Sequence, residues 1–309
     1  MDMKDIVIIG GGPAGLAAGL YAARAALDTV LLEQGTPGGQ AAGTERIENY
    51  PGFEEGIGGP ELTRRMEAQA KRFGLNVVNT SVQRLLRMDN GFAVRTADGE
   101  IHTRAVIMAS GTQPGKLGIK GEAEFHGLGV SFCATCDGAF FKGRSVAVIG
   151  GGDAAVEEAI FLTRFAEKVY IIHRRGELRA TKVLQERAKR NPKIEFIWHS
   201  VLMEILGAYF VEGILVKNVQ SGTTEELKVD GVFLYVGTRP NTGLVAGLVE
   251  LDEQGYVITG ENMATSCPGL FAAGDVRRKL LRQVVTAVAD GATAAVAAEK
   301  YLETLHTKI

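Results

Sequence analysis

Two segments of this chain repeat one pattern, a short apolar strand followed by a glycine-rich turn, a helix and a second strand. In the first segment, Ile-Val-Ile-Ile at 6–9 precedes Gly-Gly-Gly-Pro-Ala-Gly at 10–15. In the second, Val-Ala-Val-Ile at 146–149 precedes Gly-Gly-Gly-Asp-Ala-Ala at 150–155. Such a turn, set between a strand and a helix in a unit of about 30 residues, is typical of dinucleotide binding. The repeat predicts an α/β fold with two Rossmann-like nucleotide-binding domains, each built on a buried parallel sheet.

The segments between and after the two copies predict that the second domain is inserted in the first. We expect helices at 61–72, 182–190 and 284–302, strands at 76–87, 92–96, 105–108 and 231–236, and a β-meander over 194–229. The strand before Gly-Asp at 274–275 returns to the first domain, because the segment preceding it no longer resembles the second repeat. The predicted first domain therefore comprises residues 1–113 and 242–309, and the second comprises residues 114–241.

The first glycine turn predicts a nucleotide whose ribose hydroxyls are free. Gly10 allows the tight turn, Gly12 lets a pyrophosphate approach the backbone, and Gly15 permits close packing of the helix on the strand. The phosphates would lie at the helix N-terminus, where free N–H groups favour anions. Glu33 ends the second strand, 23 residues after Gly10. Its carboxylate accepts hydrogen bonds from ribose hydroxyls and repels a 2′-phosphate, so FAD or NAD is expected here.

The second glycine turn predicts a nucleotide with a 2′-phosphate. Ala155 stands at the third glycine position, which is a permitted variant. His173 replaces the acid at the end of the second strand, and Arg174, Arg175 and Arg179 follow it. Forked arginine donors match phosphate oxygens, so this cluster favours NADPH over NADH. The alternative from the residues alone is an arginine-rich, solvated loop.

The three cysteines favour redox chemistry over a structural metal site. Cys133 and Cys136 form a CxxC pair followed directly by Asp137, whereas Cys267 lies far away and is expected to be structural. Three cysteines cannot form a four-cysteine zinc site or a secreted disulfide framework, and we expect no metal. A thiol pair of this kind exchanges with external disulfides, and Asp137 is a suitable acid for the proton transfers. The alternative role for Asp137 is to cap the turn.

Composition excludes several partner classes. The 309 residues carry a net charge of -2, which gives no electrostatic case for nucleic acid or an anionic membrane. The apolar helix expected at 284–302 contains Asp290 and Glu299, so it is predicted to be a buried helix and not a membrane span. The N-terminus shows no signal peptide, and a cytoplasmic protein is expected.

Taken together, these motifs resemble bacterial-type, low-molecular-weight thioredoxin reductases over essentially the whole chain. The resemblance is carried by the first glycine turn and by the segments at 37–40, 47–53, 131–138, 173–179, 271–275 and 282–283. It implies the three-layer fold of the pyridine nucleotide-disulfide oxidoreductases, with FAD in the split domain and NADPH in the inserted domain. It also implies a homodimer that transfers electrons from NADPH through FAD to thioredoxin. In such proteins the inserted domain rotates between two states, and the short glycine-containing junctions suit that movement.

The resemblance also assigns roles to individual residues. Cys136 is the flavin-proximal thiol, Cys133 exchanges with thioredoxin and Asp137 is the acid. Asp275 holds the ribityl or phosphate end of the flavin. The residues implied around FAD are Gly10, Gly12, Pro13, Ala14, Gly15, Glu33, Gly39, Gln40, Asn49, Ala109, Gly111, Gly274, Asp275, Arg282, Gln283 and Val284. Those implied around NADPH are Gly150, Gly152, Asp153, Ala154, Ala155, His173, Arg174, Arg175, Arg179 and Gly237.

Other functions remain open at this point. A related flavoprotein disulfide reductase with a different electron partner, or a thiol oxidase that passes electrons to oxygen, uses the same parts. A non-catalytic nucleotide-binding redox sensor is disfavoured by the intact CxxC pair and Asp137. Finally, the basic residues at 277–279 with Arg282 predict a positive patch beside the flavin motif, which favours an acidic protein partner.

Overall fold

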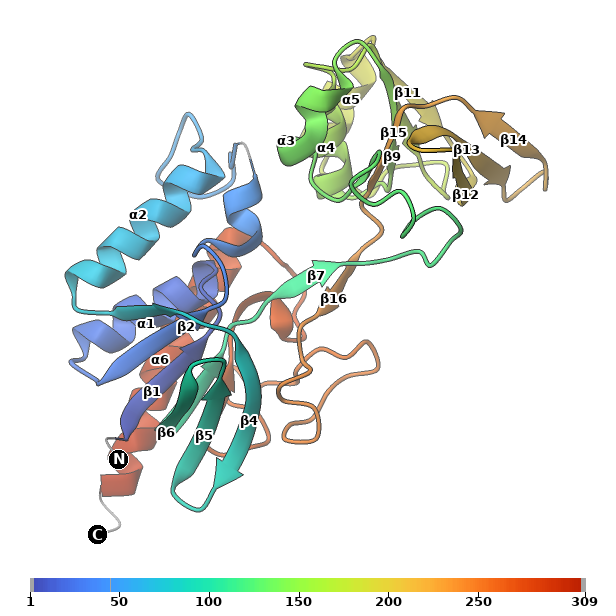
Figure 1. The fold of residues 1–309 in the computed structure, drawn as a ribbon. Helices are drawn as coiled ribbons and strands as arrows, with labels where there is room; N and C mark the ends of the chain where they lie inside the picture. The colour runs from blue at the N-terminus through green and yellow to red at the C-terminus, as the bar shows by residue number, and fades with distance from the viewer. Residues whose placement is uncertain (1–2, 45, 307–309) are drawn as a thin grey trace. The chain divides into compact units, whose positions relative to one another are not determined.

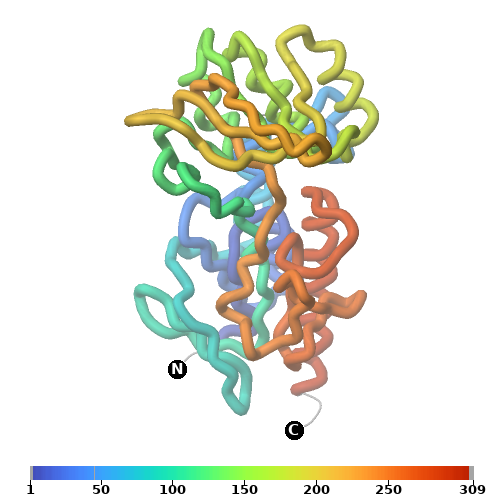
Figure 2. The backbone as a smooth tube through the Cα atoms, turned by 90° about the vertical axis from the view of Figure 1, so that its right-hand side faces the viewer, coloured from blue at the N-terminus to red at the C-terminus, as the bar shows by residue number. Residues whose placement is uncertain are grey.

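The computed structural model describes residues 3–44 and 46–306, and the chain divides into two compact units. Unit 1 comprises Met1–Gln113 with Arg239–Ile309, and unit 2 comprises Pro114–Thr238. Figure 2 shows how the chain passes from the blue and teal part of unit 1 into the green and gold segment of unit 2 before it returns in orange and red.

The return to unit 1 begins at Arg239 and not at residue 242. Asn241 explains the difference, because its backbone N–H donates to Gly111 O at 3.0 Å and its side-chain amide donates to Ser110 O at 2.9 Å. The two crossings themselves, β7 (Thr112–Pro114) and β16 (Thr238–Pro240), pair as a short two-stranded sheet. Which nucleotide each unit binds stays a prediction.

Unit 1 is built on a seven-stranded mixed sheet (Figure 1). Its strands are β1 (Lys4–Ile9), β2 (Thr29–Glu33), β3 (Asn76–Asn79), β4 (Val82–Met88), β5 (Gly91–Thr96), β6 (Gly99–Met108) and β17 (Leu270–Ala272). The order β3-β2-β1-β6 is parallel, and β17 joins the carboxyl-terminal half of β6, also in parallel. The first half of β6 pairs with β5 in antiparallel fashion, and β5 pairs with β4.

Helices cover one face of this sheet, and β4, β5 and apolar residues of the 244–257 segment cover the other. The helical elements are α1 (Pro13–Arg24), η1 (Gly39–Gly43), α2 (Gly59–Arg72), η3 (Gly274–Val276) and α6 (Val284–His306). Ile6, Ile8 and Leu31 pack toward α1 and α6, whereas the alternate residues Val7 and Val30 pack toward β4, β5 and the 244–257 segment. Side chains on both faces are therefore buried, which explains the unbroken apolar runs.

Unit 2 repeats the three-layer arrangement. Its parallel sheet has the order β11-β10-β9-β15-β8, with β8 (Val130–Ser131), β9 (Ser145–Ile149), β10 (Lys168–Ile172), β11 (Ile194–Ile197) and β15 (Gly231–Leu234). One face carries α3 (Ala134–Asp137), η2 (Gly138–Phe141), α4 (Asp153–Leu162) and α5 (Lys182–Arg190). The other face carries an antiparallel sheet of β12 (Ser200–Gly207), β13 (Val211–Asn218) and β14 (Thr224–Leu227). The predicted α/β fold with two Rossmann-like domains is confirmed.

Three predicted elements were wrong in detail. The strand expected at 76–87 is two strands, because the chain changes partner at Thr80, whose N–H donates to Glu33 O, and Ser81, whose carbonyl accepts from Ala97 N–H. The meander expected over 194–229 starts only at β12, since β11 pairs in parallel with β10. The strand expected at 105–108 is the end of a longer strand, β6. Apolar runs predict strands but not their partners.

Within the residues that the structure describes, no helix is long and apolar enough to cross a membrane.

Candidate active site

The cysteine pair and the second glycine turn lie at the same edge of the unit 2 sheet. In a parallel sheet the carboxyl ends of all strands meet at one edge, where ligands bind. β8 leads into Cys133, β9 into Gly150, β10 into His173 and β15 into Tyr235. These segments are far apart in the sequence, and the sheet order β10-β9-β15-β8 brings their ends close together.

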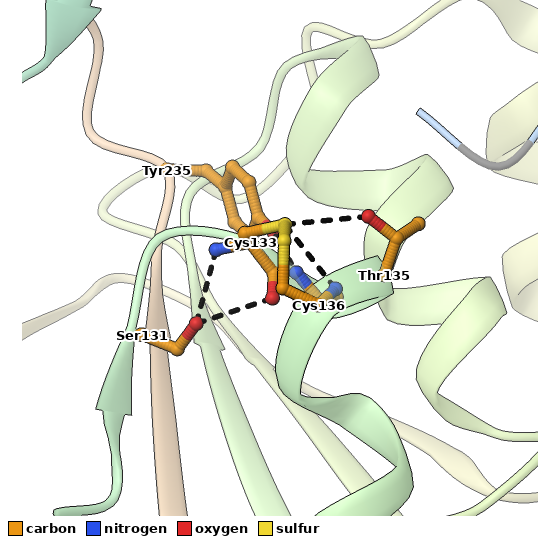
Figure 3. The surroundings of a disulfide bond; sticks show 6 residues. Ser131, Cys133, Thr135, Cys136 and Tyr235 are labelled. Carbon is orange, nitrogen blue, oxygen red and sulfur yellow. Dashed lines mark hydrogen bonds between the residues drawn. A yellow bond between two sulfur atoms is a disulfide. The ribbon is translucent and has the colours of Figure 1, made fainter. Parts of the chain in front are cut away.

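Cys133 and Cys136 are joined in a disulfide, with their Cα atoms 5.4 Å apart (Figure 3). Cys133 is the N-cap of α3, and its Sγ accepts a hydrogen bond from the backbone N–H of Cys136 at 3.2 Å. The hydroxyl of Thr135 lies 3.3 Å from the same sulfur. Ser131 fixes the approach to the turn, because its Oγ accepts from Cys133 N–H and donates to Cys133 O. These contacts favour negative charge on Cys133 Sγ when the disulfide opens.

Exposure differs between the two cysteines. Cys136 is exposed, whereas Cys133 and Asp137 are half-buried. Asp137 is the last residue of α3, so the predicted acid directly follows the exposed cysteine. Its N–H donates to Cys133 O at 3.2 Å, which keeps the short turn closed. The more exposed residue of the pair is therefore Cys136, the one that the resemblance assigned to the flavin.

Tyr235 is a component of this site that the sequence did not reveal. Its hydroxyl accepts a hydrogen bond from the N–H of Ala134, the first residue of α3, at 3.1 Å. Burial and the neighbouring Glu158 carboxylate raise the pKa of Tyr235, so the phenol stays protonated and donates to Glu158. Tyr235 thereby connects the disulfide turn with α4, the helix that follows the glycine turn. In the sequence it was only the end of an apolar strand.

We predict that Tyr235→Phe destabilises the protein. Ala134 is fully buried, so its N–H would lose its acceptor at a cost of about 1–3 kcal/mol. Thermal unfolding of the two proteins measures the difference. Tyr170→Phe is the control, because no hydrogen bond of the Tyr170 hydroxyl exists among residues 3–44 and 46–306. An unchanged melting temperature for Tyr235→Phe would show that the hydroxyl has no structural role.

The predicted flavin residues also gather at one sheet edge, that of unit 1. β1 leads into Gly10, β2 ends at Glu33, and β6 and β17 end just before Ala109 and Gly274. Gly10 has a φ of 108°, a left-handed conformation that favours glycine. Pro13 and Ala14 open α1, Gly111 lies two residues after Ala109, and Val284 begins α6.

Glu33 faces the glycine turn as predicted for a ribose ligand. Its Oε2 accepts from Gly11 N–H at 2.6 Å and its Oε1 accepts from Gly35 N–H at 3.0 Å. A carboxylate has about four acceptor positions, so two remain for ribose hydroxyls. A Cβ on Gly12 would meet only Gly39 Cα, at 3.8 Å, which leaves the backbone open to a pyrophosphate. These features fit an adenine dinucleotide.

Asp275 has a buried oxygen that fits a flavin contact in unit 1. Its Oδ1 is buried and has no hydrogen-bond partner in the described part of the chain. Burial raises the pKa of this carboxyl, an effect that the charges of Lys279 and Arg282 only partly oppose. A buried acceptor without a donor is costly, and a ribityl hydroxyl would satisfy it. The residue therefore fits the flavin role that the resemblance implied.

We predict a pH-dependent effect of Asp275→Asn. Because the folded pKa is raised, the carboxylate opposes folding above its ordinary pKa of about 4, and this cost disappears as the pH falls toward that value. Flavin-free Asp275→Asn should therefore melt at a higher temperature than flavin-free wild type at pH 8, with a smaller gain at pH 5. It should bind FAD about 10-fold or more weakly, since a charged hydrogen bond is lost. Thermal unfolding and flavin titration check both points, and equal destabilisation at both pH values would contradict them.

The other predicted flavin residues with polar side chains make three separate contacts. Asn49 Nδ2 donates to Gln283 Oε1 at 3.0 Å, which brings two predicted ligands together. Gln40 Nε2 donates to both Thr112 O and Thr112 Oγ1, at 2.7 and 2.8 Å. The guanidinium of Arg282 lies over the ring of Tyr256, 3.9 Å from its centroid.

The predicted positive patch at 277–282 is smaller than expected. Arg277 Nη1 and Lys279 Nζ donate to the two carboxylate oxygens of Asp290, at 3.0 and 2.7 Å, and all three side chains are largely buried. Asp290 also accepts from the N–H of Gly274, so this ion cluster supports the flavin segment. The Asp290 carboxylate offsets one of the four positive charges, and the Arg277 and Lys279 side chains lie inside unit 1, so less positive charge is exposed beside the flavin motif than the sequence predicted.

In unit 2 the three arginines of the second motif are exposed, but His173 is not. His173 is 5% exposed, and its ring lies where a Cβ on Gly151 would fall. Burial lowers the pKa of His173, and the charges of Arg179, Arg175 and Arg174 lower it further. His173 is thus neutral at pH 7 and adds no positive charge to the cluster, contrary to the sequence-based expectation of a basic residue there.

The backbone around the second turn is open on the nucleotide side. Gly150 has a φ of 155°, and a Cβ on Gly152 would meet no atom within 4 Å. Asp153, Ala154 and Ala155 form the first turn of α4, and the carbonyl of Gly237 accepts from Gly115 N–H. No hydrogen bond or ion pair within the described residues engages the guanidinium groups of Arg174, Arg175 or Arg179, so they are available to a phosphate.

Cys267 is a free, half-buried cysteine packed beside the core of unit 1, as expected of a structural residue. Among residues 3–44 and 46–306, no group of three His, Cys, Asp or Glu side chains is arranged to hold a metal ion.

Comparison with known proteins agrees with this geometry. A family model described as pyridine nucleotide-disulphide oxidoreductase matches residues 4–291. The thioredoxin reductase of Peptoclostridium litorale is 50% identical over 310 residues, covering 98% of each chain. That of Bacillus subtilis is 46% identical, covering 97% of this chain and 95% of its own. A solved structure titled thioredoxin reductase from Lactococcus lactis, FR conformation, is 46% identical, with a TM-score of 0.96 over 97% of this chain and 99% of that one.

Proposed function

Since the chain belongs to the pyridine nucleotide-disulphide oxidoreductase family, we propose that it reduces the disulfide of thioredoxin with electrons from NADPH, through FAD and the Cys133–Cys136 pair. One observation carries this proposal. A disulfide with one exposed cysteine lies at the same sheet edge as a nucleotide turn flanked by free arginines, and the chain contains a second nucleotide turn flanked by an acid. Relatives of about half-identical sequence bear the name thioredoxin reductase.

The residues of unit 1 fit FAD. Glu33 would bind the adenosine ribose, the open backbone at Gly12 would face the pyrophosphate, and Asp275 would accept from the ribityl chain. When bound, the flavin would accept a hydride from the nicotinamide and pass two electrons to the disulfide. The Asn49–Gln283 pair and Gln40, held by Thr112, are the polar groups that would orient it.

The residues of unit 2 fit NADPH. The turn at 150–155 offers backbone N–H groups at the start of α4 for the pyrophosphate. The exposed Arg174, Arg175 and Arg179 would bind the 2′-phosphate, which a free-hydroxyl ribose lacks. The uncharged His173 would pack beneath the turn and not bind the phosphate as a cation.

The cysteine pair supports a specific order of bond exchange. Two-electron reduction at Cys136 Sγ would break the disulfide and release Cys133 as a thiolate, which Cys136 N–H and the Thr135 hydroxyl would stabilise. In the dithiol, the exposed Cys136 attacks one sulfur of the partner disulfide and releases the partner's other thiolate. Cys133 then attacks Cys136, which restores the internal disulfide and releases the second partner thiolate. Asp137, next to Cys136, would hold or supply the proton at each step.

This order reverses one role that the resemblance implied. There, Cys133 exchanges with thioredoxin and Cys136 serves only the flavin. Exposure of Cys136 and stabilisation of charge on Cys133 favour Cys136 for both steps. We expect a homodimer whose inserted domain rotates, as the resemblance implies.

The proposed function is tested by measuring NADPH oxidation with thioredoxin or with oxygen as the electron acceptor. With oxidised thioredoxin from the same source, under nitrogen, one NADPH should be consumed for each thioredoxin disulfide reduced. If NADPH is consumed only when oxygen is admitted, with hydrogen peroxide formed and thioredoxin left oxidised, the chain is a related flavoprotein with a different electron acceptor. If NADPH is oxidised with neither acceptor, the proposal is rejected.

A further inference from the structure

The loop that carries Arg179 is held between the glycine turn and α5 by a set of short hydrogen bonds. The N–H groups of Arg179 and Ala180 both donate to the carbonyl of Gly151, at 2.7 and 3.1 Å. The next residue, Thr181, donates its N–H to Asp153 Oδ1 at 2.6 Å. The loop is thus attached to the same turn that would hold the pyrophosphate.

Gln185, on α5, holds the loop from the opposite side. It is 7% exposed, and its Nε2 donates to Leu178 O at 3.2 Å and to Ala180 O at 2.8 Å. An amide nitrogen has two protons, so both are used on the two carbonyls that flank Arg179. Leu178 and Ala180 are each 5% exposed, whereas Arg179 between them is exposed.

A buried amide in this place is unusual for an apolar helix face. The neighbours of Gln185 on the buried side of α5 are Leu184 and Ala188, which pack in the core of unit 2. Burying a polar group is unfavourable unless it is hydrogen-bonded, and both acceptors of the Gln185 Nε2 protons belong to the arginine loop. The amide therefore fixes the backbone on both sides of Arg179.

We propose that Gln185 is a positioning residue that holds Arg179 for the 2′-phosphate and so sets the preference for NADPH over NADH. This inference rests on the proposed function, in which the arginine cluster binds that phosphate. Fixing the Arg179 backbone reduces the conformational freedom lost on binding, and only a nucleotide with the 2′-phosphate benefits. A residue with a merely structural role would affect both nucleotides equally.

Gln185→Met tests the proposal, because methionine has similar length and helix propensity but donates no hydrogen bond. We expect the Kd for 2′,5′-ADP, measured by calorimetry on the purified flavoprotein, to rise about five-fold or more, though less than in Arg179→Ala. The KM for NADPH should rise in parallel while the KM for NADH stays within about two-fold, since affinity is lost only at the 2′-phosphate. Leu184→Ala is the matched control, because it opens a cavity in the same helix without touching these hydrogen bonds, and it should leave the Kd unchanged.

A double variant separates positioning from general damage. In the Arg179→Ala background, Gln185→Met should have no further effect on the Kd, since the two residues act as one unit. An unchanged Kd in Gln185→Met, or an equal rise of both KM values, would overturn the role of Gln185 while Arg179→Ala still raised the Kd for 2′,5′-ADP. If Arg179→Ala, Arg174→Ala and Arg175→Ala together left that Kd unchanged, the proposed NADPH site itself would be wrong.

Discussion

Replacing either Cys133 or Cys136 with serine should abolish reduction of thioredoxin while NADPH still bleaches the bound flavin. The internal disulfide can no longer form, so electrons have no path from the flavin to the partner. Loss of a residue that forms the covalent intermediate typically lowers turnover by about a thousand-fold or more. Stopped-flow absorbance of the flavin and a thiol assay on thioredoxin measure the two steps separately. Cys267→Ser, which alters the one free cysteine of the described chain, should change neither step.

The two serine variants should differ in one respect. With Cys133→Ser, the exposed Cys136 should capture a thioredoxin whose single cysteine is activated with thionitrobenzoate, as a stable mixed disulfide. With Cys136→Ser, the half-buried Cys133 should capture it at least about ten times more slowly. Non-reducing gel electrophoresis shows the adduct. Faster capture by Cys133 would restore the order that the resemblance implied, with Cys133 as the exchanging thiol.

The double variant Arg174→Ala and Arg175→Ala should reverse most of the preference for NADPH. Both guanidinium groups are exposed and free within the described residues, so each contact with a 2′-phosphate is taken at the lower end of its range, about 1.5 kcal/mol. Two such losses correspond to about a 100-fold rise in the KM for NADPH. The KM for NADH should change by about two-fold or less, since no 2′-phosphate is present.

Two controls complete this experiment. Arg187→Ala and Arg190→Ala remove positive charges from the far end of α5 and should leave the ratio of the two KM values unchanged. Raising the salt concentration should weaken NADPH binding in wild type more than in the double variant, because fewer charges remain to be screened. A double variant with an unchanged ratio would mean that the cluster is the solvated loop that sequence alone left open.

The parts of the fold that could be predicted are those determined by residues that are close together in the sequence. Each glycine turn, with the strand before it and the helix after it, is a local pattern, and both were found where expected. Glu33 could also be placed, because the end of the second strand of a parallel βαβ unit always lies beside the first turn. The CxxC pair could be predicted from the spacing of its two cysteines alone.

The parts that could not be predicted depend on contacts between distant segments. Tyr235 lies about a hundred residues after the cysteines, and only the strand order β15-β8 brings it to them. Gln185 looked like one polar residue in an amphipathic helix, because nothing local marks it as buried. The charges of Arg277 and Lys279 suggested a surface patch, since their pairing with Asp290 across the start of α6 is a tertiary contact.

The protonation of His173 shows the same limit in its chemistry. By residue type and position it belonged to a basic cluster, yet burial and three neighbouring arginines lower its pKa. Residue type predicts a possible charge, while burial and neighbours decide whether the charge exists. The 2′-phosphate site therefore depends on arginine, whose charge does not titrate in this range.

The most direct measurement is anaerobic titration of the purified protein with NADPH, with and without oxidised thioredoxin from the same source. We expect the yellow flavin absorbance to bleach with NADPH alone, and with thioredoxin we expect two new thiols for each NADPH consumed while the flavin stays largely oxidised. A flavin that bleaches but yields no thioredoxin thiols would contradict the proposed partner. A flavin that NADPH does not bleach would contradict the assignment of the two nucleotide sites.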